Sequence, residues 1–209
     1  MKVGDRFDVG IINGPVGKAT INRLDSSLME VSVEWGAVPP LPPPIYLLIG
    51  LCRPATVRKI LGTVPTLGAR QVLFCPTHRT DPAYSRSSLW TSGEWRDRVV
   101  EGVEQAFDTH VPGVSLGESM QQSLQKLPSG GLRLALDVYE GLFPLSSVTI
   151  PEGAPVCLAV GPERGWDARD RDWLRENGFQ LVSLHDRVLR VETAVVVGLT
   201  LLLQKMGQL

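Results

Sequence analysis

The sequence has little cysteine and histidine. Its three cysteines, Cys52, Cys75 and Cys157, are odd in number and lie far apart in apolar segments. We therefore interpret them as buried reduced thiols of a cytoplasmic protein, not as a disulfide framework. The three histidines share no metal-ligand spacing with the cysteines or with one another. We expect neither disulfides nor a bound metal.

Net charge and long apolar runs are also lacking. The chain carries 21 basic and 22 acidic residues, a formal net charge of −1. Any contact with nucleic acid must therefore come from a local patch. The longest apolar run, residues 194–203, is well short of the ~20 residues that span a bilayer. The first residues contain no apolar segment of the kind found in a secretory signal. We expect a soluble protein without membrane partners.

The composition changes along the chain at a proline-rich segment. Residues 1–38 contain alternating runs separated by Asn-Gly and Asp-Ser turns, which predicts a small β-rich domain with an antiparallel meander. Residues 39–44 follow, and their prolines indicate a stiff extended linker. The sequence thus predicts a domain boundary before residue 45.

Residues 45–209 alternate between strand and helix patterns. An apolar run at 45–51 is typical of a strand buried on both faces, and Val57, Ile60, Leu61 and Val64 form the stripe of an amphipathic helix. A helix is expected at 167–177, with Asp167 as N-cap and Gly178 beyond its end. The predicted class is α/β, a mostly parallel sheet with helices on both faces.

Three apolar strands end in loops that could carry function: 137–141, 161–166 and 185–194. The second loop, "GPERGW", leads from a strand into a helix, an arrangement that directs free backbone N–H groups toward a ligand. It fits neither the dinucleotide nor the phosphate-loop pattern, and simple chain reversal is the alternative. The third loop places Arg187, Arg190 and Glu192 before a very apolar helix, where charges are costly unless paired or used.

These two loops carry a family resemblance. "GPERGW" followed by "LHDRVLRVETA" is similar to the G-P-E-G-G…L-G-x-R-I-L-R-x-E-T-A pattern of the bacterial small-subunit ribosomal-RNA uridine-N3 methyltransferases, members of the SPOUT superfamily. The resemblance implies a trefoil-knotted methyltransferase domain over 45–209. It also implies a small PUA-like β-barrel that binds RNA over 1–38, shorter here than in the family.

The resemblance further implies a cofactor and an assembly. S-adenosylmethionine would lie in the knot, and the chain would form a homodimer through the knot and its C-terminal helix; a helix buried within its own subunit is the alternative. The cofactor-binding residues it implies are Leu136, Val160, Gly161, Pro162, Glu163, Gly165, Leu184, Val188, Leu189, Arg190, Thr193 and Ala194. Glu163 and Arg164 would brace their loop.

Methyl transfer to uracil N3 requires help with the N3 proton. A guanidinium near a uracil oxygen would stabilise the resulting anion, so Arg190 is the first catalytic candidate and Arg187 the second. Glu192 would orient an arginine through a bidentate pair or act as a base. A purely structural Arg–Glu pair is the alternative. The candidate RNA contacts are Lys18, Arg53, Lys59, Arg79, Arg86 and Gln105. For each of them, an ordinary solvent-exposed surface residue is the alternative.

Three positions depart from the family pattern. Arg164 replaces the second motif glycine, His185 replaces the glycine of the L-G pair, and Asp108 stands where an arginine is expected. The activity implied is methylation of uridine N3 in small-subunit (16S) ribosomal RNA. A paralogue with another RNA target and a non-catalytic knotted RNA-binding or assembly protein are the alternatives.

Overall fold

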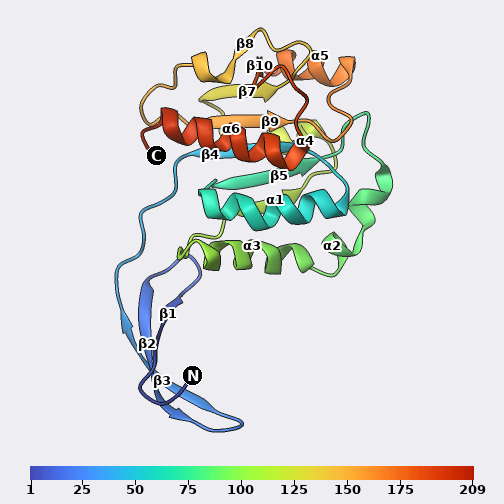
Figure 1. Cartoon of the computed structure of the whole chain (residues 1–209). Coiled ribbons are helices and arrows are strands. Elements are labelled where there is room, and N and C mark those ends of the chain that lie inside the picture. The colour runs from blue at the N-terminus through green and yellow to red at the C-terminus, as the bar shows by residue number, and fades with distance from the viewer.

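The computed structural model describes all 209 residues and contains two separate sheets. Figure 1 shows the N-terminal strands extending as an arm away from a larger layered body. The arm is an antiparallel sheet of three strands, β1 (Arg6–Gly10), β2 (Val16–Leu24) and β3 (Met29–Trp35). The predicted meander is confirmed.

The N-terminal sheet is open. Strands β1 and β3 pair only with β2, because three strands are too few to close on themselves. It is therefore not the closed barrel that the family resemblance implied. Its core is thin, with only Ala19 and Ile21 buried among its strand residues. The β1–β2 turn contacts the body, where Asn13 N donates to Thr109 O at 2.8 Å and Thr109 Oγ1 donates to Gly14 O at 2.7 Å.

The body is built on a seven-stranded sheet in the order β6-β5-β4-β9-β7-β10-β8, and every neighbouring pair is parallel. The α/β prediction is confirmed. The strands are β4 (Ile45–Gly50), β5 (Gln71–Cys75), β6 (Gly113–Leu116), β7 (Leu132–Leu136), β8 (Phe143–Pro144), β9 (Val156–Val160) and β10 (Gln180–Ser183). The short strands β6 and β8 were not predicted.

Helices cover both faces of this sheet (Figure 1). They are α1 (Pro54–Leu67), α2 (Ser88–Thr91), α3 (Glu94–Gln105), α4 (Met120–Leu124), α5 (Ala168–Glu176) and α6 (Val191–Lys205), with 3₁₀ turns η1 (Pro82–Arg86) and η2 (Leu145–Ser147). Leu47 and Ile49 of β4 pack into the core that contains α1 and α6, whereas Leu48 packs into the core under α4 and α5. This alternation follows from the two-residue period of a strand.

The helix signals in the sequence are confirmed. All four residues of the predicted α1 stripe are buried. Asp167 is the N-cap of α5, where its side chain accepts from Arg169 N at 2.7 Å and forms a capping box with Asp170.

The three cysteines are buried and unpaired, and burial raises the pKa of Cys157 to about 12. None of the helices combines the length and apolarity that a membrane crossing requires.

Candidate functional site

The carboxyl ends of β7, β9 and β10 open onto one cavity of about 620 Å³. Parallel strands present these ends at the same edge of the sheet, so the loops 137–141, 161–166 and 185–194 meet there. Residues of all three loops line the cavity, together with residues at the start of α1. Its volume lies within the roughly 300–1,000 Å³ of ordinary small-molecule sites.

The cavity gathers the residues that the resemblance implied for the cofactor. Those that line it are Leu136, Val160, Gly161, Pro162, Glu163, Gly165, Leu184, Val188, Leu189, Arg190 and Ala194. Thr193 does not line it and is exposed. Successive residues of a helix are rotated by roughly 100°. Val191, Glu192 and Ala194 therefore face the cavity, and Thr193 points to the other side of the first turn of α6.

The 161–166 turn is held against the start of α1. Gly165 N donates to Pro162 O at 2.7 Å, which closes the turn. Helix α1 begins without a capping bond from its own N-cap side chain. Instead, Glu163 Oε1 accepts from Arg53 N at 3.0 Å and from Thr56 Oγ1 at 2.8 Å. A carboxylate is favoured at a helix N-terminus by the partial positive charge there, so Glu163 has the contacts of a bracing residue.

Gly165 and Trp166 give this turn its shape. Gly165 has a φ of +67°, a conformation that side chains other than glycine rarely adopt, and no atom lies within 4 Å of the place a Cβ would take. The next residue, Trp166, is buried, and its indole Nε1 donates to Leu136 O at 3.0 Å. The turn is thereby fixed to the end of β7 and leaves open space beside Gly165.

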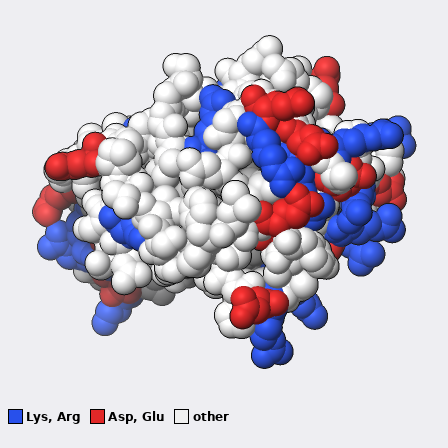
Figure 2. All heavy atoms as spheres, turned by 90° about the horizontal axis from the view of Figure 1, so that it is seen from above, with Lys and Arg blue, Asp and Glu red and all other residues white.

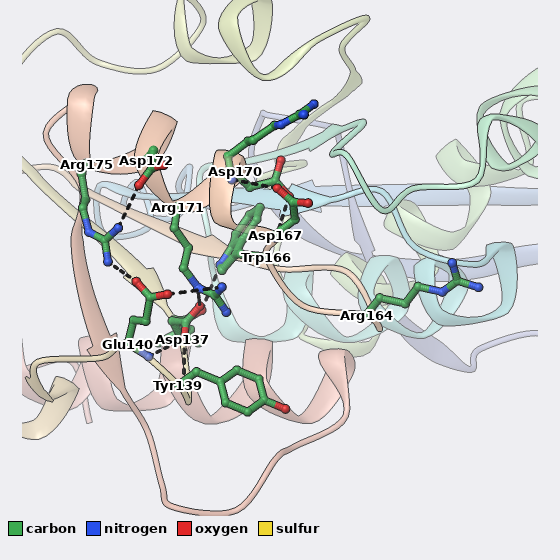
Figure 3. A network of polar contacts seen from close by, with 12 residues as sticks. Asp137, Tyr139, Glu140, Arg164, Trp166, Asp167, Asp170, Arg171, Asp172 and Arg175 are labelled. Carbon is green, nitrogen blue, oxygen red and sulfur yellow. Dashed lines mark hydrogen bonds and ion pairs between the residues drawn. The ribbon is translucent and has the colours of Figure 1, made fainter.

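A network of ion pairs fixes the third wall, the 137–141 loop (Figure 3). Asp137 Oδ1 accepts from Tyr139 N at 2.7 Å and from Glu140 N at 2.8 Å, while Oδ2 accepts from Arg171 Nε at 2.6 Å. Glu140 also pairs with Arg175. The side chains of Asp137 and Arg171 are 2% and 11% exposed. Helix α5 is therefore tied to the cavity wall by a nearly buried ion pair.

The 137–141 loop was predicted from the sequence, whereas its partner Arg171 was not. Arg171 lies on α5, an amphipathic surface helix in the sequence, and lines the cavity beside Asp137, Val138 and Tyr139. An acid directly after an apolar strand was the available signal for Asp137. Arg171 carried no such signal, because the contact depends on how α5 packs against β7.

The 184–194 segment forms the opposite wall. Leu184, Leu189 and Arg190 line the cavity, and Val188 is 70% exposed at its edge. His185, which replaces a family glycine, accepts the backbone N–H of Arg187 at its Nδ1 at 2.9 Å. The departure therefore stabilises the bend of the loop locally. Both arginines of this segment, Arg187 and Arg190, line the cavity.

The expected pair between Glu192 and an arginine is wrong. Glu192 Oε1 instead lies 2.9 Å from Lys59 Nζ of α1. The reason is geometric: Glu192 is in the first turn of α6, which packs beside α1, whereas Arg187 belongs to the preceding loop. The hydrogen bond from Lys59 lowers the pKa of Glu192, with a further contribution from the charge of Arg190. Glu192 is thus ionised at neutral pH and close to Arg190.

The candidate RNA-contacting residues divide between three places. Arg53 and Lys59 line the cavity, and Arg79 lines a smaller hollow beside it. Lys18 lies on the N-terminal arm, where it pairs with Asp8 at 2.6 Å. Arg86 and Gln105 are exposed at the ends of η1 and α3 and line neither space. The structure therefore brings three of the six candidates together, namely Arg53, Lys59 and Arg79.

Asp108, which stands where the family has an arginine, is bonded locally. Its Oδ1 accepts from Thr109 N at 2.6 Å and from His110 N at 3.1 Å, and lies 3.1 Å from the ring nitrogen Nδ1 of His110. Burial opposes ionisation of Asp108, but these hydrogen bonds prevail and lower its pKa. Asp108 is a structural cap for the chain after α3.

A second polar group lies where α5 begins. One ligand atom each from His78, Asp167 and Asp170 fall within 4.8 Å of one another. Their bonding capacity is in use, because Asp170 Oδ1 accepts from His78 N and Asp170 Oδ2 accepts from Asp167 N at 3.0 Å. The group is the capping box of α5 with the 76–81 loop attached. We assign no ion to it.

The comparisons with known proteins agree with one another. The RNA methyltransferase domain family matches residues 39–203. A protein named ribosomal RNA small subunit methyltransferase E, from Treponema pallidum, is 30% identical over 204 residues, which cover 93% of this chain and 75% of that protein. The protein named ribosomal RNA small subunit methyltransferase E 1 from Borreliella burgdorferi is 21% identical and covers 94% of this chain and 82% of its own length.

Solved structures show the same fold. A ribosomal RNA small subunit methyltransferase E from Neisseria gonorrhoeae, bound to S-adenosyl methionine, superposes with a TM-score of 0.84 at 22% identity and covers 98% of this chain and 84% of that chain. A methyltransferase from Legionella pneumophila, in complex with bound SAM, has a TM-score of 0.80 at 20% identity, with 98% and 84% covered. The similarity extends over both the arm and the body.

Proposed function

The chain belongs to the RNA methyltransferase family, and we propose that it transfers a methyl group from S-adenosylmethionine to N3 of a uridine in small-subunit (16S) ribosomal RNA. One observation carries the proposal: the loops 137–141, 161–166 and 185–194, far apart in sequence, line a single cavity with Arg187 and Arg190. A turn at 161–166 that only reversed the chain would not need to line a cavity together with the loops 137–141 and 185–194.

The residues of this cavity fit S-adenosylmethionine. Leu136, Val160, Leu184 and Leu189 supply apolar surface for a planar ring, and the turn at 161–166 supplies backbone polar groups. Open space beside Gly165 allows close approach of a ligand to the main chain. When bound, S-adenosylmethionine supplies a methyl group on a positively charged sulfonium. The chain's task is then to place the uridine and to manage its N3 proton.

Arg190 is the residue we assign to the developing charge. Loss of the N3 proton leaves negative charge on the uracil oxygens, which a nearby guanidinium stabilises without itself changing protonation. Arg190 is the N-cap residue of α6, has no side-chain capping bond and lines the cavity. Arg187, exposed on the same wall, is the second candidate for this contact.

Glu192 is better suited to positioning than to proton abstraction. A depressed pKa weakens a carboxylate as a base, and the bond from Lys59 depresses that of Glu192. The Lys59–Glu192 pair joins α1 to the first turn of α6, directly after Arg190. We assign this pair the role of holding Arg190 at the cavity, and we keep Arg190 and Arg187 as the catalytic residues.

We also propose a trefoil knot and a homodimer for this chain. In the knot, the 184–194 segment would pass through the loop that ends at 161–166. Helix α6 buries Val195, Leu199 and Leu202 in its own subunit, as the monomer alternative required. Leu201 of α6 is only partly buried, and Leu142, directly after the 137–141 loop, is 84% exposed. A second copy would cover these apolar side chains.

Residues 1–38, with the linker 39–44, would guide RNA toward the cavity of the 45–209 domain. The arm carries Lys18 and contacts the body at the end of α3. Ribosomal RNA as substrate places the enzyme in the cytoplasm. Because the chain has a net charge of −1, local clusters of cations would have to bind the RNA phosphates.

The test is the nucleoside content of small-subunit ribosomal RNA in a strain that lacks this gene. Mass spectrometry should show 3-methyluridine in the parent strain, its loss in the deletion strain, and its return with the unaltered chain. The Arg190→Ala chain should not restore 3-methyluridine. Retention of 3-methyluridine in the deletion strain would overturn the proposed product, and loss of a different methylated nucleoside would indicate another RNA target.

A further inference from the structure

A second hollow adjoins the cavity, with a volume of about 350 Å³. It lies between the loop after β5 and the 161–166 turn. The two spaces share the rim residues Arg53, Pro162, Glu163 and Arg164. A ligand that enters the cavity from this side therefore passes over the hollow. Arg53 and Arg79 in its wall are already candidate RNA contacts, and Glu163 braces the start of α1. The side chain of Arg164 has no contact assigned to it.

The walls of the hollow carry three arginines, Arg53, Arg79 and Arg164. None of them forms an ion pair. No carboxylate oxygen lies within 4 Å of their guanidinium nitrogens. This distinguishes them from Arg171 and Arg175 on α5, which are paired with acids.

The two acids of the hollow are engaged with their own chain. Asp81 Oδ1 caps η1 by accepting from Ala83 N at 2.9 Å. Glu163 Oε1 accepts from Arg53 N and Thr56 Oγ1. His78, also in the wall, is held by Asp170 at 2.9 Å. Each acid therefore has a local partner on its own chain. With three guanidinium groups against two carboxylates, the hollow keeps an excess of one positive charge.

The arginines are held in place by neutral contacts. Arg79 Nη1 donates to the main-chain oxygen of Arg164 at 2.8 Å, and Arg53 Nε lies 3.4 Å from the hydroxyl of Tyr84. That bond to Tyr84 raises the pKa of Arg53, so its guanidinium stays protonated. Arg164 makes no side-chain hydrogen bond in the structure. Figure 3 shows its side chain extending away from the Asp137–Arg171 network.

The chain as a whole has no excess of positive charge that would attract RNA. Figure 2 shows basic and acidic side chains intermixed over one part of the face seen from above, beside a wide uncharged area. A mixed surface gives little net attraction to a polyanion, and the chain as a whole carries −1. The three guanidinium groups around the hollow form a local cluster of positive charge.

We propose that this hollow binds a phosphodiester group of the RNA, next to the nucleotide that occupies the cavity, and that Arg164 is its chain-specific contact. The inference rests on the proposed function. Arginine binds phosphate through paired N–H donors, and the remaining wall is largely polar, with Leu51 and Pro162 as its apolar members. The shared rim joins the anion site to the cavity, as one continuous strand of RNA requires.

The position of Arg164 makes the inference specific. It occupies the place of a glycine in the family pattern, so its side chain adds a cation that the pattern does not supply. The Pro162–Gly165 bond and the Arg79 contact fix the backbone on both sides of it. Its removal therefore leaves the turn intact and takes away one contact.

The test compares Arg164→Ala with Arg169→Ala, an exposed arginine on α5 that lines neither space. The probes are transcribed small-subunit ribosomal RNA, titrated at several salt concentrations, and S-adenosylmethionine alone. Arg164→Ala should weaken RNA binding several-fold and reduce the slope of log K against log salt by about 0.7, the value for one single-strand phosphate contact. Arg169→Ala should change neither, and Arg164→Glu should weaken RNA binding further.

Binding of S-adenosylmethionine should be the same in all of these proteins. An unchanged RNA affinity and salt slope in Arg164→Ala, with normal methyl transfer by the unaltered chain, overturns this inference alone. Weakened cofactor binding in Arg164→Ala overturns it in favour of a contact to the cofactor's carboxylate. An unaltered chain that neither binds nor methylates the RNA overturns the proposed function and this inference together.

Discussion

Nε of Arg171 lies 2.6 Å from Oδ2 of Asp137, and both side chains are almost excluded from water. The other oxygen of Asp137 accepts two backbone N–H groups of its own loop. One carboxylate therefore joins three parts of the site: the end of β7, the loop that follows it, and α5. A nearly buried pair of this kind is sensitive to the loss of one partner, because the remaining charge is left without compensation.

Arg171→Met should lower the free energy of unfolding by about 3 kcal/mol, the typical cost of leaving one member of a buried pair uncompensated. Arg169→Met, two residues earlier on the same helix and exposed, should change it by less than about 0.5 kcal/mol. Urea denaturation measures both. Equal stability of the two variants would contradict the structural importance of the pair. Adding Asp137→Asn to Arg171→Met should restore part of the loss.

Gly165→Asn should weaken S-adenosylmethionine binding about tenfold, or about 1.4 kcal/mol. Asparagine tolerates the positive φ of Gly165 better than other side chains, and its side chain would enter the open space at the cavity wall. The matched control is Gly178→Asn, since Gly178 has a φ of +79° and equally open surroundings but does not line the cavity. Isothermal titration with S-adenosylmethionine measures the affinity of both variants. Equal affinities would show that Gly165 does not contact the cofactor.

Arg190→Ala should lower kcat at least about 100-fold, as loss of a charge-stabilising donor does in other enzymes. The dissociation constant for S-adenosylmethionine should be unchanged, since the apolar walls and the 161–166 turn remain. Single-turnover methyl transfer and cofactor titration on the same protein separate the two effects. Normal turnover would end the catalytic assignment of Arg190, and a larger fall in Arg187→Ala would transfer it to Arg187.

The Lys59–Glu192 pair predicts a pH dependence of stability. The folded-state pKa of Glu192 is lowered, so its contribution is present above the unfolded value, about 4.3, and is lost as the pH falls through the folded pKa. The difference in unfolding free energy between the unaltered chain and Glu192→Gln should therefore be constant near neutral pH. It should shrink as the pH falls below about 4.3 and disappear below the folded-state pKa. A difference that grows as the pH falls would contradict the direction of the shift.

Much of the fold could be predicted from local signals. The α1 stripe at Val57, Ile60, Leu61 and Val64 follows the helical period, and all four side chains are buried. The Asp167 cap set the start of α5. Apolar strands buried on both faces indicated a parallel sheet, and the rule that their carboxyl ends share an edge brought the three loops together.

The remainder depends on tertiary packing. Strands β6 and β8 are short, and β8 has only two residues, so neither shows a period. The Asp137–Arg171 and Lys59–Glu192 pairs join residues 34 and 133 positions apart. Charge alone did not distinguish Lys59 from Arg187 as the partner of Glu192. Thr193 lies off the cavity because the motif gives only an order of residues, whereas the helix sets which of them face the cavity.

The measurement that tests the central claim most directly is methyl transfer by the purified chain. Small-subunit ribosomal RNA from the deletion strain would be incubated with the chain and with S-adenosylmethionine carrying a labelled methyl group. The nucleosides of the RNA would then be separated and identified by mass spectrometry. We predict label in 3-methyluridine with the unaltered chain and none above background with Arg190→Ala. Absence of labelled 3-methyluridine with the unaltered chain, when the protein is folded and binds the cofactor, would contradict the account.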